Sequence, residues 1–307
     1  KLISYIVQPG GKLTGHIRVP GDKSISHRSV MLGSLAQGTT AVTGLLEGED
    51  VLATLAAFRA MGVPAEGPAG GKLIIHGVGL HGLKAPRHPL DMGNSGTAMR
   101  LMAGILVGQR FDTELTGDSS LTKRPMGRVA DPLRAMGAAL TTAEGGRPPL
   151  KIKGGLTLRG IDYRLPVASA QVKSCLLFAG LYAEGETAVT EPAPTRDHTE
   201  RMLRGFGYRV QTRGARISLR GGGTLTAGNI DVPADISSAT FFLVGASIAP
   251  GSDLLIEHVG INPTRTGVLN ILKLMGANLE LLNPREVGGE PVADIRVCAA
   301  KLHGIRI

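Results

Sequence analysis

The chain alternates between apolar runs with helical spacing and short segments in which apolar and polar residues alternate as in strands. A tetrad ending in glycine closes four of the helical runs, and glycine is a common C-terminal cap. The copies are RAMG at 59–62, RAMG at 134–137, RGFG at 204–207 and KLMG at 273–276. Their closing glycines are separated by 75, 70 and 69 residues. Spacing this regular predicts an internal repeat.

Two series of strand-like segments recur at corresponding places in the four copies. Each tetrad is followed by one segment, in the order KLIIHG, LKIKG, ARISLRG and ADIRV. A second series follows the earlier helix of each copy, in the order TAVTG, DTELTG, TAVTE and DLLIEHV. We therefore expect helix, strand, helix, strand, strand in each unit, with four units filling residues 21–307. This alternation predicts an α/β fold.

The earlier helix of each unit begins near a serine, and serine is a good N-cap. These residues are Ser24, Ser95, Ser169 and Ser237. About one turn later the first three helices carry a cation and the fourth does not, in the order Arg28, Arg100, Lys173 and Phe241. Free N–H groups and the helix dipole favour anions at such helix starts. If the first three units pack about one centre, their helix starts predict a site for a multiply anionic ligand.

Composition narrows the class of partner. The 307 residues carry a net charge of +9, which favours an anionic partner. Aromatic residues make up only 3%, too few for a platform that stacks bases, so a nucleic-acid binder is a weak alternative. Cys175 and Cys298 lie far apart, and we expect two buried thiols in a reducing compartment. No segment reaches the length of a membrane span, which favours a cytoplasmic protein.

Common catalytic motifs are missing from the sequence. GDKS lacks the spacing of a P-loop, and neither GxSxG nor HExxH occurs. His27 and His198 each lie beside basic residues, and local hydrogen bonding is the expected role of both.

Six ordered motifs carry a family resemblance that runs from end to end of the chain. They are VPGDKSISHR, GNSGTAMR, GDSSLTKRPMGR, ASAQVKS, TRDHTERML and NPTRTG. Together they resemble the 5-enolpyruvylshikimate-3-phosphate synthase (3-phosphoshikimate 1-carboxyvinyltransferase) family, in its bacterial class II type. The resemblance implies the enolpyruvyl transferase fold, an inside-out α/β barrel.

The resemblance also implies a reaction in the shikimate pathway of aromatic amino acid biosynthesis. Members transfer the enolpyruvyl group of phosphoenolpyruvate to the 5-hydroxyl of shikimate 3-phosphate through a tetrahedral adduct and release phosphate. No metal or organic cofactor is implied, and glyphosate is expected to inhibit at the phosphoenolpyruvate site. Gly96 stands where tolerant class II enzymes carry alanine, so we expect greater sensitivity to glyphosate here.

Site residues follow from the matched motifs. Lys23 resembles the lysine that contacts phosphoenolpyruvate and assists proton transfer. The expected shikimate 3-phosphate contacts are Lys23, Ser24, Arg28, Ser169, Ala170, Gln171 and Arg196. The expected phosphoenolpyruvate contacts are Lys23, Asn94, Ser95, Gly96, Thr97, Arg100, Arg124 and Gln171.

The family has six repeats in two lobes, and four are found here. We expect residues 21–234 to form a complete lobe that binds shikimate 3-phosphate, and residues 1–20 with 235–307 to form part of a second lobe. The catalytic aspartate implied by the resemblance is not matched, so we expect the chain alone to be a very weak or inactive catalyst. A truncated product, a split protein with a C-terminal partner fragment and a partial record all fit. An incomplete lobe would also expose apolar helix faces.

Two alternative functions remain open. One is a non-catalytic anion-binding lobe, or a subunit of a split synthase. The other is a UDP-N-acetylglucosamine enolpyruvyl transferase, which needs a cysteine nucleophile on a mobile loop. Cys175 is expected inside a helix, which disfavours this second alternative.

Overall fold

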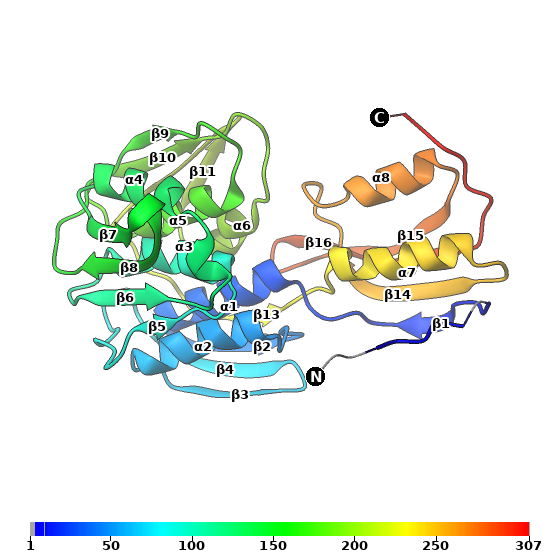
Figure 1. The fold of residues 1–307 in the computed structure, drawn as a ribbon, viewed down its shortest axis with the longest axis horizontal. Helices are drawn as coiled ribbons and strands as arrows, with labels where there is room; N and C mark the ends of the chain where they lie inside the picture. Colours follow the sequence, from blue (N-terminus) through cyan, green and yellow to red (C-terminus); the bar gives the residue numbers. More distant parts are fainter. Residues whose placement is uncertain (1–3, 9, 307) are drawn as a thin grey trace. The chain divides into compact units, whose positions relative to one another are not determined.

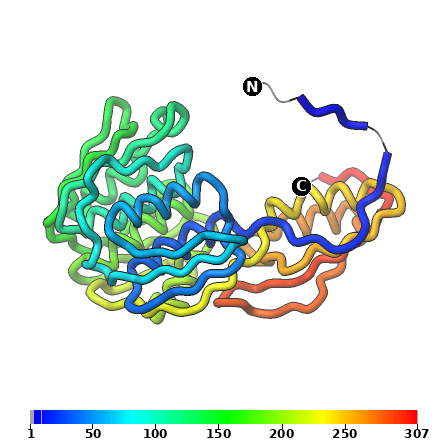
Figure 2. The backbone as a smooth tube through the Cα atoms, turned by 90° about the horizontal axis from the view of Figure 1, so that it is seen from below, coloured from blue at the N-terminus to red at the C-terminus, as the bar shows by residue number. Residues whose placement is uncertain are grey.

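The computed structural model describes residues 4–8 and 10–306 and divides into two compact units. Residues 21–232 form the large unit, and the described residues up to 20 form the small unit together with 233–306. The chain passes between the units twice, once in its blue and once in its yellow part (Figure 2). Each unit has its own hydrophobic core.

The large unit contains three copies of the predicted repeat (Figure 1). Its helices are α1 (Lys23–Leu35), α2 (Glu49–Ala60), α3 (Gly96–Leu106), α4 (Gly127–Ala135), α5 (Ala170–Gly180) and α6 (His198–Gly205), with short 3-10 turns at Leu121–Lys123 and Glu144–Gly146. Its strands are β2 (Gln37–Thr43), β3 (Ala65–Ala69), β4 (Lys72–Val78), β5 (Leu90–Asp91), β6 (Thr113–Thr116), β7 (Ala139–Ala143), β8 (Arg147–Lys153), β9 (Asp162–Arg164), β10 (Glu186–Thr190), β11 (Val210–Arg213), β12 (Arg216–Arg220) and β13 (Asn229–Asp231).

The strands of the large unit form three open four-stranded sheets, in the orders β13-β2-β4-β3, β5-β6-β8-β7 and β9-β10-β12-β11. In each sheet one short edge strand is parallel to its neighbour and the other pairings are antiparallel. The predicted α/β repeat is therefore confirmed, and each of the six strand-like segments of the first three units overlaps a strand, in the order β2, β4, β6, β8, β10 and β12. The short edge strands β5, β9 and β13 were not predicted, because two or three residues carry too little alternation to show a period.

Helices α1, α3 and α5 lie inside the large unit. Nine of the eleven residues of α3 and nine of the eleven of α5 are buried. The two helices approach so closely that a side chain at Gly104 would lie 2.1 Å from the carbonyl oxygen of Cys175. Because the bodies of these helices are packed on all sides, their first turns are the parts that reach solvent.

The small unit contains one further copy of the repeat. Its elements are β1 (Thr14–Ile17), α7 (Ile236–Ile248), β14 (Asp253–Gly260), α8 (Gly267–Leu274), β15 (Asn278–Val287) and β16 (Glu290–Cys298), and the sheet order is β1-β14-β16-β15. Helix α7 buries one side on the sheet and exposes apolar side chains on the other, with Phe241 80% and Ile248 62% exposed. Exposed apolar helix surface was expected from the sequence, and it is present here.

Both cysteines are free thiols, but only one is buried. Cys175 lies inside α5 and is inaccessible, as predicted. Cys298 is partly exposed at the end of β16, so the expectation of a second buried thiol is wrong. Its strand ends there, and the thiol points to Asp253 at the sheet surface, with Sγ 3.5 Å from Oδ1. No helix among the described residues has the length and apolarity needed to cross a bilayer.

Candidate functional site

Two of the three inner helices begin as the sequence predicts. The Ser95 hydroxyl accepts the Ala98 N–H at 3.0 Å and caps α3, and the Ser169 hydroxyl accepts the Val172 N–H at 3.3 Å and caps α5. The remaining N–H groups of each first turn stay available, which leaves a partial positive charge at each helix start.

Helix α1 begins differently, because an aspartate replaces serine as its cap. Asp22 accepts the Ile25 N–H at 2.9 Å, and Ser24 is then the second helical residue. In the small unit Asp235 likewise caps α7 in place of Ser237. The prediction of serine caps is wrong for these two helices, since an aspartate two residues before the serine accepts an N–H group of the first turn instead.

Lys23 is the first residue of α1, and its side chain is half exposed. Its ammonium group lies 3.0 Å from Asp50 Oδ2, on the first turn of α2. The ion pair keeps the ammonium group beside the start of α1. An exposed pair of this kind adds little stability.

Arg28 is the most constrained of the predicted site residues. It is 3% exposed, and its guanidinium group donates in three directions. Nε donates to Thr199 Oγ1 at 2.7 Å, Nη2 to Ser174 Oγ at 2.8 Å and Nη1 to the Ser24 carbonyl at 2.9 Å. Arg28 therefore ties α1 to α5 and α6.

The loop before α3 is held by polar contacts. Arg124 Nη2 donates to Asn94 Oδ1 at 2.7 Å, and Asn94 Nδ2 donates to Asp118 Oδ2 at 2.8 Å. The Asn94 amide and the Leu121 and Ser120 N–H groups lower the pKa of Asp118. Asp118 belongs to the motif GDSSLTKRPMGR but was not among the predicted site residues, because its contact with Asn94 depends on the tertiary fold.

Arg100 and Gln171 join the starts of α3 and α5. Arg100 Nη1 donates to Gln171 Oε1 at 2.8 Å, and Gln171 Nε2 donates to Thr97 Oγ1 at 2.9 Å. The glutamine amide thus lies between two other predicted site residues. This contact confirms that two of the predicted helix starts converge.

Two guanidinium groups meet beside Gly96, the first residue of α3. A Cβ atom at Gly96 would lie 2.7 Å from Arg100 Nη1 and 3.3 Å from Arg124 Nη1. Within residues 4–8 and 10–306, both arginines donate only to uncharged oxygens. Burial lowers the pKa of Arg100, and the positive charges of Arg124 and Arg128 lower it further. Two like charges at a helix start, neither of them in a direct ion pair within the described part of the chain, form a site for an anion.

The third repeat differs from the expected pattern. Lys173 is fully buried and forms ion pairs with Glu191 and Glu200. The expectation of a cation available at the start of α5 is therefore wrong, because two carboxylates already neutralise it. Arg196 is exposed on the connection between β10 and α6, while Ser169 and Ala170 are half-buried at the start of α5.

His27 has the hydrogen-bonding role that was expected for it. Its ring is buried between Thr54 Oγ1, 2.8 Å from Nδ1, and Ser95 Oγ, 3.4 Å from Nε2. Burial, and to a lesser extent the Arg28 charge, lowers its pKa to about 3. The ring is therefore neutral at physiological pH and does not exchange protons there.

Comparison with known proteins agrees with this geometry. The profile of the EPSP synthase (3-phosphoshikimate 1-carboxyvinyltransferase) family matches residues 7–307. The chain belongs to the EPSP synthase family. It is 68% identical to 3-phosphoshikimate 1-carboxyvinyltransferase of Methylococcus capsulatus, over the whole of this chain and 70% of that protein. The enzyme of the same name from Hydrogenovibrio crunogenus is also 68% identical, over 99% of this chain and 70% of the relative.

Solved structures show the same family. EPSP synthase from Acinetobacter baumannii superimposes with a TM-score of 0.92 at 62% sequence identity, over 97% of this chain and 68% of that one. The fold expectation is thereby confirmed as the mixed α/β fold of EPSP synthases. The chain is a transferase of this family, as its motifs implied.

Cys175 gives a further reason to prefer EPSP synthase over its nearest rival. The thiol is buried in the middle of α5, and burial raises its pKa above the ordinary value. A nucleophilic cysteine needs exposure and a lowered pKa. Cys175 therefore does not support the rival enolpyruvyl transferase, which needs a cysteine nucleophile.

Proposed function

We propose that the chain carries the substrate-binding residues for transfer of the enolpyruvyl group of phosphoenolpyruvate to the 5-hydroxyl of shikimate 3-phosphate, with release of phosphate. The observation that supports this most strongly is the pair of guanidinium groups beside Gly96. Arg100 and Arg124 present two positive charges at the start of α3, and among the described residues both donate only to uncharged oxygens. A phosphorylated, carboxylated substrate supplies the missing negative charge.

In this proposal phosphoenolpyruvate binds at the start of α3. Its phosphate accepts from Arg124 and Arg100, and the loop of Asn94, Ser95, Gly96 and Thr97 supplies backbone N–H groups. Gln171 would contact the same ligand, because its amide already lies between Arg100 and Thr97. Several preorganised donors in one place stabilise a dianion without rearranging.

Shikimate 3-phosphate binds between the starts of α1 and α5. Ser24 and Arg28 come from α1, and Ser169, Ala170 and Gln171 come from the start of α5. Arg196 donates to the 3-phosphate as a charge-assisted hydrogen-bond donor. The residues of this group all lie in the large unit, which supports its assignment as the shikimate 3-phosphate lobe.

Lys23 lies on α1, where contacts to both substrates are expected. Its ammonium group binds anionic oxygen of either ligand, and a shift away from Asp50 would free it to assist proton transfer to the enol carbon. The candidate residues include no carboxylate placed as a base for the 5-hydroxyl. We therefore expect very weak turnover by the 307-residue chain alone.

A calorimetric titration of shikimate 3-phosphate into the chain tests the proposal. Saturable binding that is weakened about tenfold or more by Arg196→Ala is the expected result, since a charged hydrogen bond contributes roughly 1.5–3 kcal/mol. Arg220→Ala, at an exposed arginine of β12, is the matched control and should bind normally. Absence of binding by the folded chain would refute the proposed acceptor.

The phosphoenolpyruvate group is tested by competition. We propose that glyphosate competes with phosphoenolpyruvate in the presence of shikimate 3-phosphate, and that Arg124→Ala weakens the binding of both. Binding of both ligands unaffected by Arg124→Ala would contradict the placement at Gly96. A non-catalytic lobe predicts the same binding but no phosphate release when both substrates are present.

A further inference from the structure

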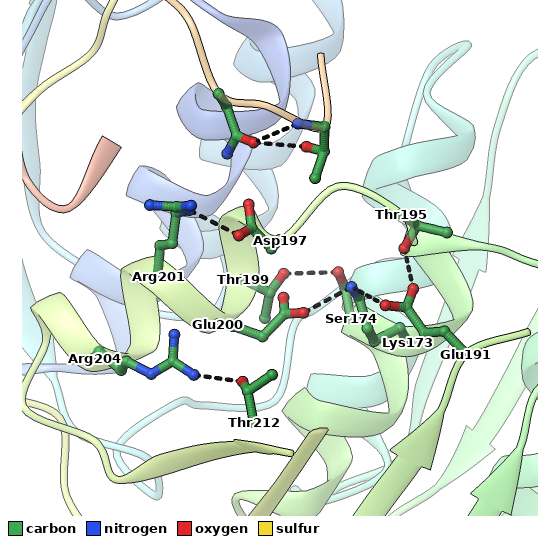
Figure 3. A network of polar contacts seen from close by, with 12 residues as sticks. Lys173, Ser174, Glu191, Thr195, Asp197, Thr199, Glu200, Arg201, Arg204 and Thr212 are labelled. Carbon is green, nitrogen blue, oxygen red and sulfur yellow. Dashed lines mark hydrogen bonds and ion pairs between the residues drawn. The ribbon is translucent and has the colours of Figure 1, made fainter. Parts of the chain in front are cut away.

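An ion triad lies inside the large unit, with Lys173 between two glutamates (Figure 3). Lys173 Nζ is 3.0 Å from Glu191 Oε2 and 2.7 Å from Glu200 Oε1. Lys173 has no exposed surface, Glu191 is 9% exposed and Glu200 is 2% exposed. The triad is thus almost completely removed from water.

The triad holds the connection between β10 and α6 at both ends. Glu191 is the first residue after β10, and Glu200 lies in the first turn of α6. The Thr195 hydroxyl donates to Glu191 Oε1 and fixes the middle of the same connection. Arg196 is the next residue. Lys173, on α5, therefore fixes the segment that carries Arg196 against the helix that Ser169 caps.

A second contact runs parallel to the triad. The hydroxyls of Ser174 and Thr199, each adjacent to a triad residue, lie 2.7 Å apart, and both accept from the Arg28 guanidinium. Helices α5 and α6 are thus joined at two successive positions. This network connects the three segments that carry the residues predicted to bind shikimate 3-phosphate, namely α1, α5 and the β10–α6 connection.

The repeat shows that the triad is not required by the fold. The residue directly after β2, β6 and β10 is Gly44, Gly117 and Glu191, and the third residue of α2, α4 and α6 is Val51, Val129 and Glu200. Carboxylates occur at these two positions only in the third repeat of the large unit. Apolar residues at such positions are often as stabilising as a buried ion pair. A positioning role explains the charges better than stability does.

We propose that Lys173 is a positioning residue that acts through Glu191 and Glu200 to place Arg196 for the phosphate of shikimate 3-phosphate. This inference rests on the proposed function. The triad sets the distance between Arg196 and the start of α5, which holds the rest of the ligand. Its loss therefore weakens recognition of the 3-phosphate more than recognition of the ring and carboxylate.

The experiment compares shikimate 3-phosphate with shikimate, which lacks the phosphate, by calorimetry or competition. The quantity measured is the ratio of the two affinities. We expect Lys173→Met to lower this ratio about tenfold, as loss of a charged hydrogen bond would. We expect no further decrease when Arg196→Ala is added, because the lysine acts through the arginine. Lys153→Met, at an exposed lysine of β8, is the matched control.

A milder variant covers the case in which Lys173→Met does not fold. Thr195→Val keeps the buried charges and removes only the bond from the connection to Glu191. Here we expect a decrease in the ratio of about threefold, again absent in the Arg196→Ala background.

The outcomes separate this inference from the proposed function. Equal weakening of both ligands by the folded variants, or an unchanged ratio, would overturn the positioning role alone. Additive effects of Lys173→Met and Arg196→Ala would overturn it as well. A wild-type chain that binds no shikimate 3-phosphate would overturn the proposed function, and the inference with it.

Discussion

Acidification should destabilise the large unit through His27. The neutral ring fits its surroundings, because Thr54 donates its hydroxyl to the Asp50 carbonyl and can accept from Nδ1–H. Nε2 then accepts from Ser95, whose oxygen also caps α3. A protonated ring would bring a second buried positive charge next to Arg28 and would place an N–H where the Ser95 hydroxyl donates.

The size of the effect follows from the two pKa values of His27, about 3 in the folded protein and 6.5 as the ordinary value. Between these values the unfolded chain binds more protons, so stability is present above pH 6.5 and is lost as the pH falls. One pKa unit is about 1.4 kcal/mol, so the whole window corresponds to about 5 kcal/mol. Between pH 7 and pH 5 the expected loss is about 2 kcal/mol.

Urea unfolding at pH 7 and pH 5 measures this loss. The free energy of unfolding should fall by about 2 kcal/mol more in the wild type than in His27→Gln, whose side chain does not titrate. His88→Gln, at an exposed histidine, should behave like the wild type and serves as the control. If the wild type and His27→Gln lose the same free energy between the two pH values, the buried neutral ring is not the cause.

Three further predictions use other sites. Gly96→Ala should displace the flexible Arg100 guanidinium group, since the new methyl would lie 2.7 Å from Nη1. Binding of glyphosate should then weaken more than binding of phosphoenolpyruvate. Equal changes in the inhibition constant of glyphosate and the binding constant of phosphoenolpyruvate would contradict this. Asp22→Ala should lower the free energy of unfolding by about 1 kcal/mol through loss of the α1 cap, whereas Ser24→Ala should lower it less. Urea unfolding measures both changes, and an equal or larger loss in Ser24→Ala would contradict the assignment of Asp22 as the cap. Phe178→Ala should destabilise the large unit by about 3–5 kcal/mol, because the ring is fully buried in α5, and a smaller loss in urea unfolding would mean that neighbouring helices collapse into the space.

The repeat could be predicted from sequence because its signals are local. The glycine closing each tetrad adopts a positive φ that other residues avoid, 97° at Gly137, so the tetrads mark real helix ends. The strand-like segments are five to seven residues long, enough to show a period. The edge strands β5, β9 and β13 depend on pairing with a neighbour and carry no such signal.

The candidate site was predictable to the extent that motifs named its residues. The contacts among those residues depend on the tertiary fold, as the Gln171 amide between Arg100 and Thr97 illustrates. Partners outside the motifs could not be found, since Asp50, which pairs with Lys23, lies 27 positions along the chain from it. No local pattern connects two residues so far apart.

Arg100 and Lys173 show why the type of residue alone does not identify an anion site. Each is a cation about one turn into an inner helix, so the same availability to an anion was expected of both. Arg100 meets uncharged oxygens and a second guanidinium group, whereas Lys173 meets two buried carboxylates. The difference is already present in the aligned repeats, where Gly117 and Val129 of the second repeat stand opposite Glu191 and Glu200 of the third. The charges on the neighbouring strand and helix of each repeat therefore decide the role of such a cation. Without carboxylates there the cation remains available to a ligand, and with them it holds ligand-binding segments in place.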